Sequence, residues 1–336
     1  MIAAVKAARA PGFSFKEVKE PEIGDSEVLI RSKVASICGT DLSIYLWNEW
    51  AQGRIKKIPL TIGHEFAGEV VEAGKNVDNI EIGDIVSAET HIFCNECYSC
   101  RNNRRHLCEN MEILGVDRDG CFTEYLSLPA QNAWKNDRSV PNDLLSVQEP
   151  LGNAVDTVLA GGGVEGKDVA IFGCGPIGLM MIAVARACGA GKIFASDSSE
   201  YRLKIARAVG ADRTINFMEE DEREAIGKVD VVCEASGSDS ALQKALSILY
   251  PGGRLSLLGL FHAPVNVNLT DDVIFKGIEV HGITGRHVYE TWYKVAALLP
   301  RLNLKPIITH KLRLDDLEKG FELMKNRECG KVVLEV

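Results

Sequence analysis

Four cysteines in one short segment have the spacing of a metal site. The pattern C-x2-C-x2-C-x7-C is formed by Cys94, Cys97, Cys100 and Cys108. Four thiolates in so short a loop can close a tetrahedral shell around one zinc ion, which leaves no position open for a substrate. The pattern therefore predicts a structural zinc that stabilises a protruding lobe in place of a hydrophobic core.

The same segment would suit two other uses. Soft thiolate ligands also suit an iron–sulfur cluster, and a zinc ribbon flanked by Arg101, Arg104 and Arg105 could contact nucleic acid. The net charge of 38 − 47 = −9 argues against a phosphate backbone as partner. We therefore expect a structural zinc and no nucleic-acid partner.

A glycine-rich turn forms the second chemical signature. The segment 169–172 has the composition of a buried strand, and G-x-G-x-x-G follows it at Gly173, Gly175 and Gly178, with a helix beginning near Ile177. The first glycine permits the tight turn, the second lets the backbone approach a pyrophosphate, and the third lets helix and strand pack closely. A helix N-terminus beside such a turn attracts phosphate groups.

An acidic residue follows at the distance that dinucleotide-binding folds require. Asp197 lies 19 residues after Gly178, at the end of the next predicted strand. A carboxylate there accepts hydrogen bonds from the adenosine ribose and repels a 2′-phosphate, which favours NAD over NADP. Arg202 could lie against the adenine, or could instead accommodate NADP. A glycine-rich turn without a ligand is the remaining alternative.

Cys38 and His64 are the third group that could do chemistry. Each follows a predicted strand, in Cys38-Gly-Thr-Asp and in Gly-His64-Glu65. Taken alone, a cysteine is a small buried apolar residue and a histidine is a core residue. Thiolate, imidazole and carboxylate are also zinc ligands, and three of them leave a fourth position for water or a substrate hydroxyl.

Together these motifs resemble the zinc-dependent medium-chain dehydrogenases over essentially the whole chain. The segments that carry the resemblance are 63–68, 83–86, the cysteine loop and 173–178. The resemblance implies that Cys38 and His64 bind a catalytic zinc, that Glu149 completes or approaches its shell, and that Glu65 ligates it transiently. Two zinc ions per chain and NAD are the cofactors implied.

Longer segments are similar to the L-threonine 3-dehydrogenase branch of that family, and they lie at residues 47–52, 88–91, 114–120, 134–136, 148–156 and 282–293. This implies oxidation of the L-threonine β-hydroxyl to 2-amino-3-oxobutanoate, with the zinc lowering the pKa of the hydroxyl and hydride passing to NAD. Polyol, 2,3-butanediol or other secondary-alcohol oxidation is the alternative enzyme activity. A non-enzymatic regulator that binds zinc and nucleotide is a more distant one.

The same resemblance implies roles for individual residues. Thr40 takes the proton from the alcohol and passes it to the nicotinamide ribose, although it could also be a turn hydroxyl bonded to the backbone. His91 and Glu149 contact the substrate, although His91 could instead join the structural zinc. Arg286 binds the substrate carboxylate, unless it is only a surface arginine. Many relatives end the proton relay with histidine where this chain has Ser43, so we expect the proton to pass to solvent.

The secondary-structure elements that must position these residues follow two different patterns along the chain. The first part reads as short strands, such as 28–34 and 66–72, separated by turns. From about residue 167, strands alternate with helices, which implies a doubly wound parallel sheet. The predicted strands are 169–172, 192–196, 229–234, 254–258 and 280–282, and the predicted helices include 177–188 and 201–209.

The fold class predicted is therefore α/β, with a β-rich GroES-like catalytic domain interrupted by a Rossmann domain. The catalytic domain would comprise residues 1–150 and 288–336, and the NAD-binding domain residues 151–287. The final strand, near residues 330–336, would return to the first domain.

Composition bounds the setting of the protein. Hydrophobic residues make up 46% and charged residues 25%, as in ordinary globular chains. The longest uncharged run, 169–185, is interrupted by glycines and a proline, so we expect a buried strand and helix, not a membrane span. Metal-like cysteine spacing favours a reducing, cytoplasmic location. The resemblance also implies a homotetramer.

Overall fold

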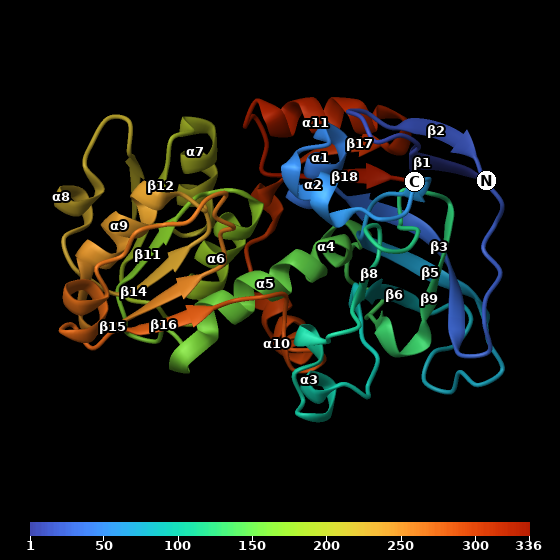
Figure 1. The fold of residues 1–336 in the computed structure, drawn as a ribbon, viewed down its shortest axis with the longest axis horizontal. Helices are drawn as coiled ribbons and strands as arrows, with labels where there is room; N and C mark the ends of the chain where they lie inside the picture. The colour runs from blue at the N-terminus through green and yellow to red at the C-terminus, as the bar shows by residue number, and fades with distance from the viewer. The chain divides into compact units, whose positions relative to one another are not determined.

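The chain divides into two compact units, which the computed structural model describes over residues 1–336 (Figure 1). Unit 1 contains residues 1–149, 310–326 and 331–336, and unit 2 contains residues 150–309 and 327–330. The second boundary differs from the predicted one, because residues 288–309 group with unit 2. They form the helix α10 (Glu290–Leu298) and two 3-10 turns, the second of which packs against helices of unit 2.

Unit 1 is built on an antiparallel sheet of seven strands in the order β10-β6-β5-β3-β18-β17, with β9 also paired to β3. Its strands are β3 (Glu27–Ser36), β5 (Glu65–Ala73), β6 (Ile85–Ala88), β9 (Tyr125–Pro129), β10 (Ala133–Lys135), β17 (Ile308–Arg313) and β18 (Lys331–Glu335). The predicted strands 28–34 and 66–72 are confirmed within β3 and β5. Strand β18 pairs with β3, so the final strand returns to unit 1.

Smaller elements surround this sheet. A second sheet has the order β2-β1-β4, and a two-stranded pair joins β7 to β8. These strands are β1 (Ile2–Lys6), β2 (Ser14–Glu17), β4 (Leu60–Thr61), β7 (His91–Ile92) and β8 (Glu112–Ile113). The helices are α1 (Gly39–Leu46), α2 (Glu49–Arg54), α3 (Tyr98–Arg101), α4 (Asn142–Ser146) and α11 (Leu317–Lys325).

A buried lysine fastens the C-terminal end of α1. The Lys6 side chain is fully buried, and its ammonium donates to the carbonyls of Ala10, Gly12 and Tyr45, at 2.9 Å for Gly12. It also lies 5.0 Å from the centre of the Trp47 ring. A cation is favourable at this end of a helix because the last carbonyls carry partial negative charge. Lys6 therefore helps to orient the helix that begins next to Cys38.

Unit 2 is a six-stranded parallel sheet in the order β13-β12-β11-β14-β15-β16. Its strands are β11 (Val169–Phe172), β12 (Ile193–Asp197), β13 (Arg213–Asn216), β14 (Val229–Glu234), β15 (Leu249–Leu257) and β16 (Glu279–Gly282). Its helices include α5 (Gln148–Leu159), which begins in unit 1, α6 (Pro176–Ala187), α7 (Glu200–Val209), α8 (Glu222–Ile226) and α9 (Asp239–Ile248). The strand order is that of a dinucleotide-binding fold, which confirms the predicted α/β class.

The strands of unit 2 are held by an apolar core between sheet and helices. Side chains of β11, β14 and β15 pack with Leu242, Ala245 and Leu246 of α9. Burial on both faces explains why the strand segments read as continuous apolar runs in the sequence.

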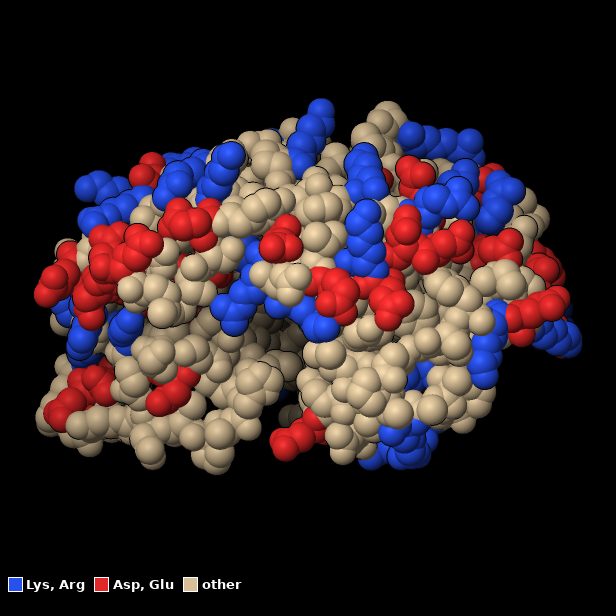
Figure 2. All heavy atoms as spheres, turned by 90° about the horizontal axis from the view of Figure 1, so that it is seen from above, with Lys and Arg blue, Asp and Glu red and all other residues tan.

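Two further features are the distribution of charge on the surface and the length and polarity of the helices. On the face seen in Figure 2, acidic and basic side chains lie intermingled. None of the helices combines the length and the apolar character that a bilayer span requires.

Candidate active site

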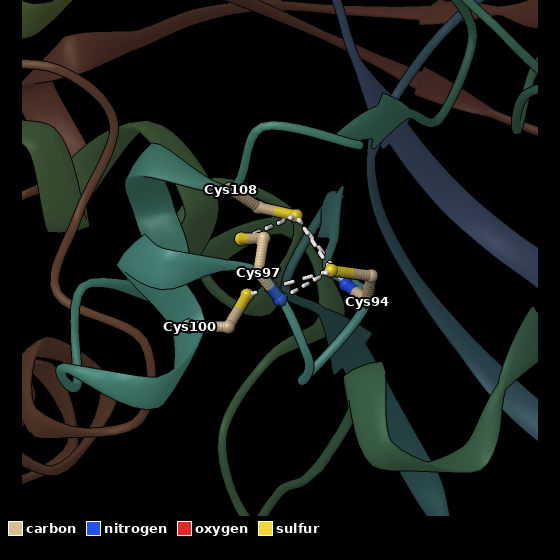
Figure 3. A group of neighbouring side chains, drawn as sticks. All are labelled: Cys94, Cys97, Cys100 and Cys108. Carbon is tan, nitrogen blue, oxygen red and sulfur yellow. Dashed lines mark hydrogen bonds between the residues drawn. The ribbon is translucent and has the colours of Figure 1, made fainter.

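The four predicted cysteines of the lobe turn their sulfur atoms toward one another (Figure 3). The Sγ–Sγ distances are 3.5 Å between Cys94 and Cys108, 3.9 Å between Cys97 and Cys108, and 4.0 Å between Cys94 and Cys100. A tetrahedral zinc with bonds of about 2.3 Å requires sulfur atoms roughly 3.8 Å apart. The four side chains therefore fit a closed zinc site, and no disulfide joins them.

Backbone amides reinforce the thiolate character of this cluster. The N–H of Cys97 donates to Cys94 Sγ and the N–H of Cys94 donates to Cys108 Sγ, each at 3.4 Å. Amide donors from Glu96 and Cys97 lower the pKa of Cys94 to about 6, whereas desolvation raises that of Cys100 to about 12. Amides that point at sulfur stabilise negative charge, as four thiolates around one dication need.

Cys38, His64 and Glu65 form the second cluster, entirely within unit 1. Their candidate ligand atoms all lie within 4.8 Å of one another. Cys38 is the N-cap of α1, while His64 and Glu65 stand at the start of β5. The β3–β5 pairing brings these two segments together, because Ser36 at the end of β3 pairs with Glu65. Thiolate, imidazole and carboxylate in this arrangement suit zinc.

Asp41 orients two members of this cluster. Its Oδ2 accepts the N–H of Cys38 at 2.8 Å, and its Oδ1 lies 3.4 Å from His64 Nδ1. Burial alone would lower the pKa of His64, but the charges of Asp41 and Cys38 outweigh burial and raise that pKa well above its ordinary value. A carboxylate behind the imidazole fixes the ring and increases its strength as a metal ligand.

Glu65 has two carboxylate oxygens in different surroundings. Oε2 accepts hydrogen bonds from the Ser36 hydroxyl and the Lys331 ammonium, whereas Oε1 is buried and accepts none. Desolvation raises the pKa of Glu65, against the opposing charge of Lys331. Burial by itself would lower the pKa of Lys331, but the attraction of Glu65, Cys38 and Asp41 together outweighs burial and raises that pKa. An unsatisfied buried oxygen beside a thiolate and an imidazole fits a metal ligand.

Glu149 lies in the first turn of α5 and is not part of the three-residue cluster. Its Oε1 accepts the Thr90 hydroxyl at 2.9 Å. Glu65 and Glu149 are close enough that each charge acts on the other, and this contributes to the raised pKa of Glu65. Glu149 is thus a buried carboxylate close enough to the cluster to influence the charge of Glu65.

His91 directly follows Thr90 and is the first residue of strand β7. The Glu89 carboxylate accepts the N–H of His91 at 3.0 Å, and the Asn132 amide donates to the carbonyls of His91 and Glu89. The ring of His91 remains partly exposed, with 14% of its side-chain surface accessible. The cysteine cluster is complete without His91.

Thr40 and Ser43 lie on one face of α1, because residues three apart on a helix are neighbours. Both side chains are half-buried. Thr40 follows Cys38 by two residues and lies in the first turn of α1.

In unit 2 the glycine turn has the geometry expected of a pyrophosphate cradle. Gly173 has φ +93°, which favours glycine, and a Cβ on Gly178 would lie 1.9 Å from the Gly173 carbonyl oxygen. Around Gly175 no atom lies within 4 Å of an added Cβ. Gly175 is the N-cap of α6, and Pro176 and Ile177 form its first turn. Space therefore opens where the free N–H groups of the helix point.

Asp197 ends β12 directly beside this turn. Its Oδ2 accepts the N–H of Cys174 at 2.7 Å and its Oδ1 accepts the N–H of Ser199 at 2.9 Å. A carboxylate has about four acceptor positions, so both oxygens can still accept ribose hydroxyls. Arg202 lies in the first turn of α7, half-buried, and donates from Nε to the Cys329 carbonyl at 3.3 Å.

Arg286 is a buried residue in the structure, not a surface arginine. It is 1% exposed, and its guanidinium donates to Asn153 Oδ1 at 3.3 Å and lies over the Trp292 ring. The next residue, His287, donates its N–H to Asp156 at 2.7 Å.

Sequence reasoning missed several residues that the structure places in or beside the site. These residues are Asp41, Thr90 and Lys331, none of which has a role predicted from the sequence. Asp41 lies three residues after Cys38, a spacing that an N-cap interaction would have explained. No local signal marks Lys331, which is distant in sequence from both of its partners.

Comparison with known proteins gives the family. The alcohol dehydrogenase GroES-like domain matches residues 24–141, and the zinc-binding dehydrogenase domain matches residues 176–301. L-threonine 3-dehydrogenases from Caldanaerobacter subterraneus subsp. tengcongensis and from Pyrococcus abyssi are 50% and 52% identical to the chain, over 99% of it and 98% of each relative.

Solved structures agree with this assignment. An alcohol dehydrogenase from Thermus sp. ATN1 superposes with a TM-score of 0.89 at 31% identity, over 100% of both chains. The 2R,3R-butanediol dehydrogenase from Bacillus subtilis also gives 0.89, at 27% identity over 100% of both chains. The predicted resemblance is confirmed, and the chain belongs to the zinc-dependent medium-chain dehydrogenases, as an NAD- and zinc-dependent enzyme of the L-threonine 3-dehydrogenase branch.

Proposed function

We propose that this enzyme oxidises the β-hydroxyl of L-threonine to 2-amino-3-oxobutanoate with transfer of hydride to NAD. The observation that carries the proposal is the cluster of Cys38, His64 and Glu65, whose ligand atoms lie within 4.8 Å of one another. It occurs in a chain about half identical to L-threonine 3-dehydrogenases over nearly its full length.

Cys38 and His64 would hold the catalytic zinc, with Glu65 and Glu149 as its two carboxylate neighbours. Zinc in such a site supplies Lewis acidity, which makes a hydroxyl easier to deprotonate near neutral pH. The thiolate and imidazole would hold the metal, and Asp41 would help to position them, because it accepts the Cys38 backbone N–H and lies 3.4 Å from His64 Nδ1. The four cysteines of the lobe would hold a second, structural zinc.

The substrate is a zwitterion, so its ammonium group needs an acceptor and its carboxylate needs a donor. Glu149 would accept from the ammonium, and His91, with its partly exposed ring, would donate to the substrate. Arg286 is the proposed partner of the substrate carboxylate. The Thr40 hydroxyl would take the proton that leaves the substrate, and Ser43, on the same helix face, would pass it toward water.

The glycine turn and Asp197 would bind NAD. Gly173, Gly175 and Gly178 shape the turn, Ile177 lies in the first helical turn of α6, which would face the pyrophosphate, and Arg202 would lie against the adenine. Asp197 would accept hydrogen bonds from the ribose and disfavour the extra phosphate of NADP. Its existing bond to the Cys174 amide also holds the turn in place.

We also propose a homotetramer in the cytoplasm. Strand β16 is an edge of the parallel sheet, and Val280 on it is exposed together with Leu269, Ile274 and Phe275. The open backbone groups of an edge strand can pair with a second copy, and the exposed apolar side chains of the nearby helical turn 269–275 would be buried in such a contact. None of the ten cysteines is paired in a disulfide, as a reducing compartment allows.

The decisive experiment is NADH formation by the zinc-loaded enzyme with L-threonine, D-threonine, sorbitol and 2,3-butanediol as parallel substrates. We expect the highest kcat/KM with L-threonine, and Cys38→Ser should abolish turnover and remove one of two zinc ions. A higher kcat/KM with a diol or polyol would reject threonine as substrate and the roles of His91 and Arg286. Two bound zincs and bound NAD without any turnover would favour the regulatory alternative.

A further inference from the structure

A buried lysine connects the two segments that carry the candidate zinc ligands. Lys331, the first residue of β18, is 2% exposed. Its ammonium donates to the Ile37 carbonyl at 2.9 Å and to Oε2 of Glu65. Ile37 directly precedes Cys38, and Glu65 directly follows His64. The Lys331 ammonium therefore restrains the backbone next to Cys38 and the side chain next to His64.

The contacts of Glu65 are strongly asymmetric. The Ser36 hydroxyl and the Lys331 ammonium both occupy Oε2, while Oε1 is buried without a hydrogen bond. An oxygen of this carboxylate lies within 4.8 Å of the candidate ligand atoms of Cys38 and His64. A small movement of Glu65 would therefore bring it to a zinc held by those two residues, since zinc–oxygen bonds are about 2.0–2.2 Å long.

Negative charge predominates around this position. Asp41, Glu65 and Glu149 are buried carboxylates, and Cys38 would add a thiolate. Lys331 is the buried cation that offsets this charge at Glu65. Removing one partner of a buried ion pair leaves an uncompensated charge, which seeks another cation or a proton. Without Lys331, the strongest available cation for Glu65 is the zinc.

We propose that Lys331 is a positioning residue that competes with the catalytic zinc for Glu65 and thereby keeps one coordination position open for the substrate. The inference rests on the proposed zinc site at Cys38 and His64. Lys331 holds the carboxylate back through Oε2 while leaving it close enough to approach the metal. A zinc with four permanent protein ligands is a structural site, whereas a catalytic zinc needs an open position.

The test compares Lys331→Met, Lys331→Arg and the double variant Lys331→Met/Glu65→Gln with the wild-type enzyme. The readouts are the rate of zinc release to a chelator, the visible absorption spectrum of the cobalt-substituted enzyme, and kcat and KM separately. NADH binding by unit 2 and thermal unfolding monitor folding. The double variant removes both charges of the pair, so it remains informative if the single variant folds poorly.

In Lys331→Met we expect zinc release from the catalytic site to slow at least tenfold. The cobalt spectrum should change because a further oxygen ligand is added. We also expect kcat to fall at least tenfold. Lys331→Arg should remain near wild type, and Glu65→Gln in the double variant should restore release and spectrum. Unchanged release and spectrum in Lys331→Met, or faster release that Glu65→Gln does not reverse, would overturn the proposal. If Cys38→Ser still bound two zincs, the zinc site and this inference would both be wrong.

Discussion

In the glycine turn, the same substitution at two positions three residues apart, Gly175→Ala and Gly178→Ala, should have different consequences. An alanine at Gly175 meets no atom within 4 Å, and the backbone there (φ −62°, ψ 176°) is open to any residue. Lower entropy of the unfolded chain would stabilise the variant by about 0.4–1 kcal/mol. Loss of glycine at an N-cap would cost a similar amount, about 0.5–1 kcal/mol. Gly175→Ala should therefore unfold within about 1 kcal/mol of wild type.

The same methyl group at Gly178 has no room. Its Cβ would lie 1.9 Å from the Gly173 oxygen, and ordinary contact begins at 3.4 Å, so the turn must move by 3.4 − 1.9 = 1.5 Å. Overpacking of this size costs about 1–3 kcal/mol or more, against a gain of about 1 kcal/mol in helix propensity. Gly178→Ala should therefore be measurably less stable in urea unfolding without NAD.

Cofactor binding should separate from stability in Gly175→Ala. The added methyl projects into the space where the pyrophosphate would approach, and loss of one charge-assisted hydrogen bond costs about 1.5–3 kcal/mol. We expect NADH affinity, measured by fluorescence titration, to fall about 10- to 150-fold. Wild-type NADH affinity in Gly175→Ala, or wild-type stability in Gly178→Ala, would refute this account of the turn.

Two further predictions concern unit 1. Cys97→Ser should leave one zinc per chain in place of two and make the lobe between Cys94 and Cys108 sensitive to proteolysis, as metal analysis and limited digestion can show; a retained second zinc would contradict the four-thiolate site. Burial lowers the pKa of Lys6 from 10.5 to about 8, so between these values the folded chain binds fewer protons than the unfolded chain. The free energy of unfolding of wild type relative to Lys6→Met should therefore rise with pH across that window in urea titrations, and a flat difference would count against a desolvated ammonium.

Much of unit 2 was predictable because its strands are buried on both faces. Strands β11 and β14 begin and end at the predicted residues, since β11 is an unbroken apolar run and β14 is a mainly apolar, β-branched run between turns. Strand β13 was not predicted, because only Ile215 of its four residues is buried and no pattern results. Helix α5 was also missed, since Pro150 and Gly152 near its start conceal an apolar face. The contacts group residues 288–309 with unit 2, and this packing is not visible in the composition from which a boundary at residue 288 was predicted.

The candidate site was predictable where ligands lie in short motifs. Cysteine spacing indicated the four-cysteine cluster, and the motifs around Cys38 and His64 indicated the second cluster, in which the geometry brings these two residues together with Glu65. The sequence does not predict the residues that form hydrogen bonds and ion pairs with the candidate ligands. Thr90 and Lys331 act through pairings between distant strands and helices, and one sequence does not reveal which buried lysine meets which glutamate.

The place of β18 in the chain determines when this site can be finished. Strand β18 pairs with β3 and carries Lys331, yet every residue of β11 to β16 lies between them in sequence. During synthesis the segments around Cys38 and Glu65 emerge long before the strand that completes their sheet. The first unit must therefore wait for the second to be made, and the nascent chain spends that interval with an unpaired strand edge and an uncompensated buried glutamate. Slow elongation across residues 150–330 would lengthen the period in which the incomplete sheet can pair incorrectly with other strands or be cleaved by proteases.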